Sequence, residues 1–469
     1  MDLKGKKVLV FGSGISGTAA SGLLLKEGAA VILYDGNTSL DRKYIEQIVL
    51  QSASGAFEVI LGKIPDEIIQ SLDLVIMSPG VPLFIPEVER FKSGNIPIWG
   101  EIELAYVLGK GDVLAITGTN GKTTTTALLG EIMKAYRDDA YVVGNIGNPY
   151  TAVAAETTVD SIVVAEMSSF QLESIHTFSP KVSAILNISP DHLDRHLTME
   201  NYIAAKEKIA MNQGISDTCV LNYEDAVTRE FGRQVKARVL YFSSRRKLDK
   251  GVYLEDGNII CHLDRPVKIC HVNDLHILGT HNYENVMAAV AMAAAYGVPD
   301  DIIRNTVLTF KGVAHRIEFV AEKNGVAFYN DSKGTNTDAA IKAIQAMNRP
   351  TLLIGGGYDK DAVYDDWIQA FDGKVKKLVL VGATKEKIAA TARRLGFTEI
   401  VLTDTFEEAV QVCADLAVPG DAVLLSPACA SWGMFINYEE RGDKFKELVQ
   451  RMRKQDETNK AQTLKNKEN

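Results

Sequence analysis

Short apolar runs alternate with segments of helical periodicity along almost the whole chain. In the first half the runs read KKVLVF, AAVILYD, LDLVIMS, DVLAITG, SIVVAEMS, VSAILNI and TCVLN. After residue 350 the same alternation returns in TLLIGGG, KLVLVG, EIVLT and AVLLSP. Buried strands separated by amphipathic helices are typical of parallel sheets covered by helices, so the pattern predicts an α/β protein.

Two interruptions divide this pattern. Glycine and proline break it near 93–105 (SGNIPIWGEIELA), and a second break falls near 310–320 (FKGVAHRIEFV). We therefore predict three consecutive α/β domains followed by a polar tail that is low in apolar residues. Their expected ranges are 1–99 for a Rossmann-like domain, 100–312 for a central P-loop ATPase domain, 313–455 for a Rossmann-like C-terminal domain and 456–469 for the tail.

Three local patterns add detail to this architecture. The stretch FVAEKNGVAFYND predicts a hairpin that turns at Asn324-Gly325. Residues 250–275 are also hairpin-like and predict a small antiparallel addition. The Ala-rich stretch 286–298 (VMAAVAMAAAYGV) is too short to span a bilayer and predicts a buried helix.

Composition narrows the classes of function. With 46% hydrophobic and 24% charged residues the chain resembles an ordinary globular protein, and its net charge of −9 argues against a nucleic-acid partner. The five cysteines show no CxxC spacing, which argues against structural zinc and a disulfide framework and favours a reducing compartment. The start MDLKGKKVLVF runs directly into a strand and leaves no room for a signal peptide. We expect a cytoplasmic monomer that is not inserted in a membrane.

The first glycine-rich turn, GSGISG, follows the first apolar run. Gly12, Gly14 and Gly17 fit G-x-G-x-x-G, and Asp35 ends the next strand. This spacing is typical of dinucleotide-binding domains, so by spacing alone a nicotinamide-dependent dehydrogenase is one interpretation.

A second glycine-rich turn, TGTNGKTTT, has the parts of a phosphate-binding loop. Gly118 and Gly121 allow the backbone to approach phosphate oxygens, Lys122 neutralises their charge and Thr123 is suited to ligate Mg²⁺. The usual motif has an additional glycine where Ile116 stands. We predict ATP as the nucleotide. The loop residues expected to contact it are Gly118, Thr119, Asn120, Gly121, Lys122, Thr123 and Thr124.

This loop resembles the ATP loop of the Mur ligase family, whose relatives include folylpolyglutamate synthetases and whose members phosphorylate a carboxylate and couple it to an amine. Further along, EMSSFQL matches the family's E-x-S-S-F-Q-L, which implies that Glu166 binds Mg²⁺. The segment NISPDHLDRH matches another family motif and implies that His192 binds a second Mg²⁺ and contacts the reacting groups. By the same resemblance Asn145, in GNIGNP, lies beside substrate and metal.

Lys206, in YIAAKEKIA, has two interpretations. By helical spacing alone it is a solvated surface charge. The family resemblance instead implies a lysine that reacts with CO₂ to form a carbamate, an anionic oxygen ligand suited to Mg²⁺. The implied catalytic residues are then Lys122, Glu166, His192 and Lys206, and the implied metal ligands are Thr123, Glu166, His192 and Lys206.

The segment GTHNYENVMAAV contributes Asn282 and Asn285, three residues apart and therefore on one helical face. The resemblance places both around the nucleotide, with Arg316 at its phosphates. Considered alone, Asn282 is predicted to be a helix N-cap, a role compatible with nucleotide binding.

The last third of the chain indicates the incoming amine. The motif in YNDSKGTNTDA resembles that of the D-glutamate-adding members of the family. It implies that Asp331 and Lys333 approach the nucleotide and that Thr335 faces the amino acid. The segment SPACASWGMFINYEERG matches the same members. There the resemblance implies that Ser431 binds glutamate and that Tyr438 replaces a frequent phenylalanine, and Lys360 is the candidate cation for glutamate.

In those members the first glycine turn holds the uridine diphosphate of UDP-N-acetylmuramoyl-L-alanine. The matched positions are Gly14, Ile15, Ser16 and Asp35. The resemblance thus implies a ligase for this substrate and D-glutamate that uses ATP and two Mg²⁺ ions. Three alternatives stay open: a ligase for another amine, a dehydrogenase and a non-catalytic P-loop regulator.

Overall fold

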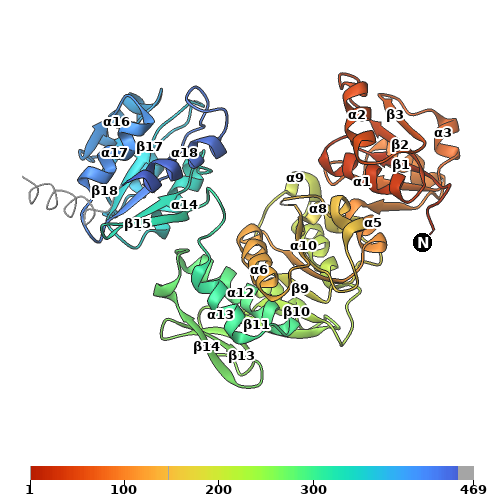
Figure 1. Ribbon diagram of the computed structural model, residues 1–469, viewed down its shortest axis with the longest axis horizontal. Coiled ribbons are helices and arrows are strands. Elements are labelled where there is room, and N and C mark those ends of the chain that lie inside the picture. The colour runs from red at the N-terminus through yellow and green to blue at the C-terminus, as the bar shows by residue number, and fades with distance from the viewer. Residues whose placement is uncertain (1, 146, 453–469) are drawn as a thin grey trace, which may run out of the picture. The chain divides into compact units, whose positions relative to one another are not determined.

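The structure is a computed structural model that describes residues 2–145 and 147–452; the predicted tail lies outside the described residues. Three β-sheets follow one another along the chain (Figure 1). By compactness the chain forms two units. One runs up to Val272 and includes Glu284–Val307, and the other contains Asn273–Tyr283 and the chain from Leu308. The three-domain division with its boundaries stays a prediction.

The first sheet has five parallel strands in the order β3-β2-β1-β4-β5. Successive side chains of β1 alternate between its faces: Val8 and Val10 pack with α1 and α2, whereas Leu9 and Phe11 pack with α3 and α4. The strands are β1 Lys7–Phe11, β2 Ala30–Asp35, β3 Phe57–Leu61, β4 Leu74–Met77 and β5 Ile98–Gly100. The helices are α1 Ile15–Lys26, α2 Arg42–Ser52, α3 Asp66–Gln70, α4 Pro86–Ser93 and α5 Glu101–Leu108.

The second sheet has nine strands in the order β14-β13-β12-β11-β10-β9-β6-β8-β7, parallel except for the pairs β12–β13 and β13–β14. The strands are β6 Asp112–Thr117, β7 Ala140–Gly144, β8 Ile162–Glu166, β9 Val182–Ile185, β10 Thr218–Asn222, β11 Arg238–Ser243, β12 Gly251–Glu255, β13 Asn258–His262 and β14 Pro266–His271. The helices are α6 Lys122–Tyr136, α7 Tyr150–Val153, α8 Ser169–Glu173, α9 Leu193–His196, α10 Met199–Glu207, α11 Ala226–Phe231, α12 Thr280–Tyr296 and α13 Asp300–Thr309.

The third sheet has six strands in the order β15-β16-β20-β17-β18-β19, parallel except for β15–β16. One core packs it against α14, α15 and α16 and a second against α17 and α18. The strands are β15 Glu318–Lys323, β16 Val326–Asn330, β17 Thr351–Gly355, β18 Val375–Leu380, β19 Ile400–Leu402 and β20 Ala422–Leu425. The helices are α14 Thr337–Ala346, α15 Asp365–Gln369, α16 Lys385–Arg394, α17 Phe406–Leu416 and α18 Tyr438–Arg451.

These sheets confirm the predicted α/β fold. The hairpin β15–β16 turns at Asn324-Gly325, where both residues have positive φ. The segment predicted to be hairpin-like forms β12, β13 and β14. The Ala-rich stretch lies in α12, where Val286 to Ala293 are almost fully buried. Among the described helices, none is both long enough and apolar enough to cross a bilayer.

All five cysteines are buried, and none of them forms a disulfide: Cys219, Cys261, Cys270, Cys413 and Cys429. Burial raises the pKa of the Cys219 and Cys261 thiols to about 12, and it also raises the pKa of Cys413 and Cys429. Because the thiolate is the reactive form, these side chains are packing residues.

Candidate active site

The phosphate loop lies between β6 and α6, as predicted. Gly121 has φ +85°, and a Cβ there would lie 2.1 Å from Asn285 Oδ1, so only glycine fits. Gly118 also has positive φ. The Lys122 ammonium donates hydrogen bonds to the carbonyls of Gly118 (2.8 Å) and Thr119 (2.9 Å). The loop thus combines a helix N-terminus with a cation folded over it, an arrangement suited to an anion.

Glu166 ends β8 beside this loop and is 1% exposed. Its Oε1 accepts a hydrogen bond from Asn145 Nδ2 at 2.9 Å, so the structure joins these two predicted residues. Its Oε2 is buried and has no hydrogen-bond partner among the described residues. A buried carboxylate oxygen without a donor is costly unless a cation binds it, so Glu166 fits a magnesium ligand.

Lys206 lies in α10 and is 2% exposed, which makes the reading of it as a solvated surface lysine wrong. Its ammonium donates a hydrogen bond to the carbonyl of Gly118 at 2.8 Å and lies 4.8 Å from the centre of the Tyr202 ring. Burial, together with the charge of Lys122, lowers the pKa of Lys206 to about 7. A large fraction of this amine is therefore neutral and nucleophilic near neutral pH.

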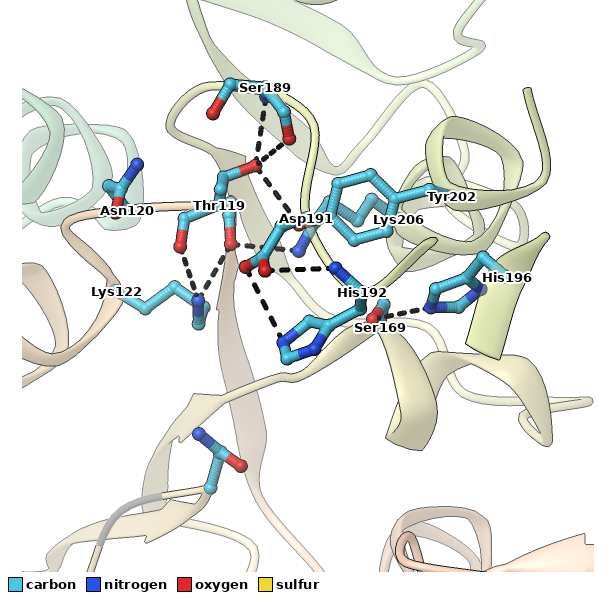
Figure 2. A network of polar contacts seen from close by, with 12 residues as sticks. Thr119, Asn120, Lys122, Ser169, Ser189, Asp191, His192, His196, Tyr202 and Lys206 are labelled. Carbon is cyan, nitrogen blue, oxygen red and sulfur yellow. Dashed lines mark hydrogen bonds and ion pairs between the residues drawn. The ribbon is translucent and has the colours of Figure 1, made fainter. Parts of the chain in front are cut away.

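His192 precedes α9 in a left-handed conformation with φ 52°, which is uncommon for a residue other than glycine. Its Nε2 lies 3.5 Å from Asp191 Oδ2, and its ring lies 4.9 Å from the Phe170 ring. Figure 2 shows the side chains of Lys122, Lys206 and His192 around the loop that carries Thr119. In the described part of the chain no three His, Cys, Asp or Glu side chains form a metal-binding group.

The structure adds site residues that were not predicted. The Tyr202 hydroxyl lies 3.1 Å from Thr119 Oγ1, and Tyr202 is one helical turn before Lys206, a spacing that offered a signal. His196 Nε2 lies 2.9 Å from Ser169 Oγ, and its Nδ1 lies 3.3 Å from Glu173 Oε1. The two residues of each of these pairs are far apart in the sequence, so helical periodicity does not predict their contact.

The first glycine turn lies between β1 and α1. A Cβ on Gly17 would lie 1.8 Å from the Gly12 carbonyl oxygen, so the turn requires glycine there. Asp35 Oδ2 accepts hydrogen bonds from the Ser13 N–H (3.0 Å) and hydroxyl (2.7 Å). Ile15 is exposed at the start of α1. The predicted residues Gly14, Ser16 and Asp35 are therefore gathered at this turn, and their contacts with a substrate stay a prediction.

On α12, one proposed role needs correction. The helix begins at Thr280, so Asn282 lies inside its first turn and is not an N-cap. The Asn282 amide instead donates a hydrogen bond to the Leu278 carbonyl at 2.7 Å. Asn285 is buried beside Gly121, in keeping with a place near the nucleotide loop.

In the second unit the loop after β16 meets the loop after β20. Asp331 Oδ2 accepts a hydrogen bond from Ser426 Oγ at 2.7 Å, and burial raises the pKa of Asp331 to about 7. The Lys333 ammonium donates a hydrogen bond to the Tyr438 hydroxyl at 2.8 Å. Arg441, 1% exposed, was not predicted. It donates hydrogen bonds to the Ser332 hydroxyl and carbonyl and to the Cys429 carbonyl, and so links the two loops.

The remaining predicted residues of this unit lie near these loops. Ser431 is 3% exposed, Thr335 is half-buried, and Arg316 is exposed. The Lys360 ammonium lies 4.8 Å from the centre of the Trp432 ring, and the Tyr358 ring contacts the same tryptophan. The structure thus places Lys360 next to the residue that follows Ser431.

Comparison with known proteins supports this arrangement. The chain matches the models of the MurD-like N-terminal domain (residues 6–100), the Mur ligase middle domain (116–293) and the Mur ligase glutamate ligase domain (315–429). It is 55% identical over 451 residues to the UDP-N-acetylmuramoylalanine--D-glutamate ligase of Lachnospira eligens, covering 96% of this chain and 99% of that one. It is 56% identical over 450 residues to the protein of the same name from Lachnoclostridium phytofermentans, again covering 96% and 99%.

Solved structures show the same fold. The UDP-N-acetylmuramate-alanine ligase of Thermotoga maritima matches with a TM-score of 0.55 and 21% identity, covering 95% of this chain and 99% of that one. The MurF ligase of Thermotoga maritima in complex with ADP matches with a TM-score of 0.52 and 18% identity, covering 96% and 97%. With both glycine turns, the buried lysine and all three domain matches in place, the chain belongs to the Mur ligase family.

Proposed function

We propose that the chain is an ATP-dependent ligase that forms an amide bond between UDP-N-acetylmuramoyl-L-alanine and D-glutamate, a step in the synthesis of peptidoglycan precursors. The observation that carries ligase chemistry is Lys206, buried with its amine on the phosphate loop. The choice of amine is supported by relatives named as D-glutamate ligases that are 55% and 56% identical over nearly the full chain. We further propose that the chain acts as a cytoplasmic monomer.

The proposed reaction has two steps. The carboxylate of the L-alanyl substrate attacks the γ-phosphorus of ATP, which gives an acyl phosphate and ADP. The amine of D-glutamate then attacks the activated carbonyl, and phosphate leaves through a tetrahedral intermediate. The protein contributes positioning and charge neutralisation, which is the usual requirement of phosphoryl transfer.

Specific residues are assigned to each part of this reaction. Lys122 and the amides of the loop from Gly118 neutralise the phosphates, with Arg316 as a further cation. The nucleotide contacts also include Thr119, Asn120, Gly121, Thr123, Thr124, Asn282, Asn285, Asp331 and Lys333. The sugar nucleotide contacts are Gly14, Ile15, Ser16, Asp35 and Asn145, and the D-glutamate contacts are Thr335, Lys360, Ser431 and Tyr438.

Two magnesium ions would be held by Thr123, Glu166, His192 and carbamylated Lys206. The orphaned oxygen of Glu166 and the low pKa of Lys206 support this donor set. When bound, magnesium would supply positive charge that neutralises the negative phosphate oxygens. In the carbamylation of Lys206 the neutral amine attacks CO₂, an N–C bond forms and one proton is released, which leaves an anionic carbamate.

The assignment is tested by phosphate release from ATP with UDP-N-acetylmuramoyl-L-alanine and a panel of amines. We expect release to require D-glutamate and to be absent with L-glutamate, L-lysine or L-alanine. The Lys122→Ala variant provides the background rate. Release that is independent of D-glutamate would reject the assignment, and release with another amine would favour a different ligase of the family.

A further inference from the structure

Arg195 joins the two substrate regions of the first unit, and neither proposed step of the reaction uses it. Its Nη1 donates a hydrogen bond to the Pro79 carbonyl at 2.9 Å, and its Nη2 donates one to the Val81 carbonyl at 3.3 Å. Pro79 and Val81 belong to the turn after β4, which we call the SPGVP turn (residues 78–82). Arg195 lies in α9, which follows a strand of the second sheet, whereas the SPGVP turn follows β4 of the first sheet. A single guanidinium therefore binds two carbonyls of a turn that belongs to a different sheet.

The SPGVP turn lies against the first glycine turn. The Ser78 hydroxyl donates a hydrogen bond to the Gly12 carbonyl at 3.3 Å. A Cβ on Gly12 would lie 2.9 Å from Ser78 Cβ and 3.4 Å from Val81 Cγ2. The SPGVP turn is therefore in direct contact with the first glycine turn, where the nucleotide of the substrate is proposed to bind.

The other side of Arg195 leads to His192. The guanidinium carbon of Arg195 lies 4.2 Å from the centre of the Phe170 ring. The centre of the Phe170 ring in turn lies 4.9 Å from that of the His192 ring. Its Nη2 also forms an ion pair with Glu173 Oε2 at 2.7 Å, and Glu173 in turn contacts His196. The Arg195 side chain, which projects from α9, is thus held in place by the Glu173 carboxylate and the face of the Phe170 ring.

Burial makes these contacts specific. The side chain of Arg195 is only 10% exposed and that of Glu173 19% exposed, so water does not easily replace their contacts. A planar guanidinium with several donors suits two carbonyls and a carboxylate at once, whereas a lysine ammonium is a single point charge. The geometry therefore requires arginine rather than any cation.

We propose that Arg195 is a positioning residue that fixes the SPGVP turn relative to His192. This inference rests on the proposed function, because it is the sugar nucleotide that spans the two regions. Its nucleotide is held at the first glycine turn, and its L-alanyl carboxylate must reach the γ-phosphate. Arg195 sets the distance between those two points.

The test compares three variants with the wild type. Arg195→Gln removes the charge and the planar fork, and Arg195→Lys keeps only the charge. Arg90→Gln is the matched control, because Arg90 also binds a backbone carbonyl (Ile64) and a carboxylate (Asp66), but within the first domain alone.

The first measurement does not depend on activity. Hydrogen exchange is followed by mass spectrometry in peptides that contain Gly80 and Val81. We expect faster exchange there in Arg195→Gln and wild-type rates in Arg90→Gln. Unchanged exchange in Arg195→Gln would overturn the proposal even if the enzyme is a D-glutamate ligase.

The second measurement is kinetic. For Arg195→Gln we expect kcat/KM for UDP-N-acetylmuramoyl-L-alanine to fall by about 100-fold, the size typical of a small misplacement of reacting groups. The affinity of Arg195→Gln for UDP alone, which reaches only the first glycine turn, should stay within about twofold of the wild-type affinity. Arg195→Lys should recover only part of the wild-type kcat/KM. A lower melting temperature with unchanged kcat/KM would overturn the proposal in favour of a purely structural role. If the wild type turned over substrate without D-glutamate, the proposed function would be rejected instead. The hydrogen-exchange result would still test the role of Arg195.

Discussion

The Lys206 ammonium donates a hydrogen bond to the Gly118 carbonyl at 2.8 Å, in a site where the lysine is 2% exposed. A buried amine in contact with the phosphate loop explains why burial and the nearby Lys122 lower its pKa to about 7. This contact places the amine that we propose to be carbamylated beside the residues expected to bind ATP.

Replacement of Lys206 by arginine should abolish most activity. A guanidinium keeps the charge but cannot form a carbamate, and we expect kcat to fall by at least about 100-fold, the scale of losing a preorganised charge. Phosphate release measures the rate, and ¹³C NMR after exposure to ¹³CO₂ detects the carbamate. Lys134→Arg, at an exposed position of α6, is the control and keeps both signals. An active Lys206→Arg enzyme contradicts the carbamate role.

Carbamylation should also depend on pH. Because the folded-state pKa of Lys206 is about 7, the neutral amine dominates above that value and is lost as the pH falls through it. Lowering the pH from about 8 to about 6 should therefore reduce the carbamate signal, and added bicarbonate should restore part of it. A carbamate signal that stays constant over this range would show that Lys206 does not titrate there.

Replacement of Glu166 by glutamine should weaken the use of magnesium. The neutral amide removes the buried oxygen charge that lacks a donor, so the Mg²⁺ concentration for half-maximal rate should rise by about tenfold or more. The melting temperature should be equal or higher, since an uncompensated buried charge is lost. Glu101→Gln is the matched control, because Glu101 is also buried with one unpartnered oxygen, and burial raises its pKa to about 7. Equal magnesium dependence in both variants would refute the role of Glu166.

Gly121→Ala should eliminate ATP binding. The added Cβ would lie 2.1 Å from Asn285 Oδ1, and a positive φ of 85° is unfavourable for alanine. The backbone cost of alanine at positive φ is about 1–2 kcal/mol, so Gly297→Ala is the control, with φ +96° and no atom within 4 Å of its Cβ. Calorimetry with ADP should show binding only in the control, and UDP should bind both variants. Wild-type affinity for ADP in Gly121→Ala would contradict the requirement for glycine.

Lys360→Met should raise the KM for D-glutamate. A lost hydrogen bond to a charged group costs about 1.5–3 kcal/mol, which corresponds to a rise of about 10- to 100-fold. The KM for ATP should stay unchanged. Lys387→Met is the control, because Lys387 forms an ion pair with Asp359 in the same loop. A normal KM for D-glutamate in Lys360→Met would remove Lys360 from the amino-acid site.

Sequence patterns were sufficient for the fold because they report local rules. The alternation of β1 places Val8 and Leu9 on opposite faces, and the Asn324-Gly325 turn needs positive φ at both residues. Glycines at 17 and 121 were recognisable for a related reason, since a side chain there would collide with the backbone or a neighbour.

What the sequence could not supply are contacts between distant segments. The burial of Lys206 depends on how α10 packs on the loop after β6, which helical spacing does not encode. The contact of Arg195 with Pro79 joins residues 116 positions apart. Asn282 was misplaced by a shorter margin: an N-cap there would start the helix at Tyr283, whereas the helix starts three residues earlier, at Thr280.

The burial of all five cysteines has a practical consequence. Their thiols are hidden from maleimide dyes, so a single cysteine introduced at an exposed position, such as Ile436 in the loop before α18, would be labelled selectively. Fluorescence from that dye would then report on the surroundings of this loop during turnover, and no native cysteine would have to be replaced.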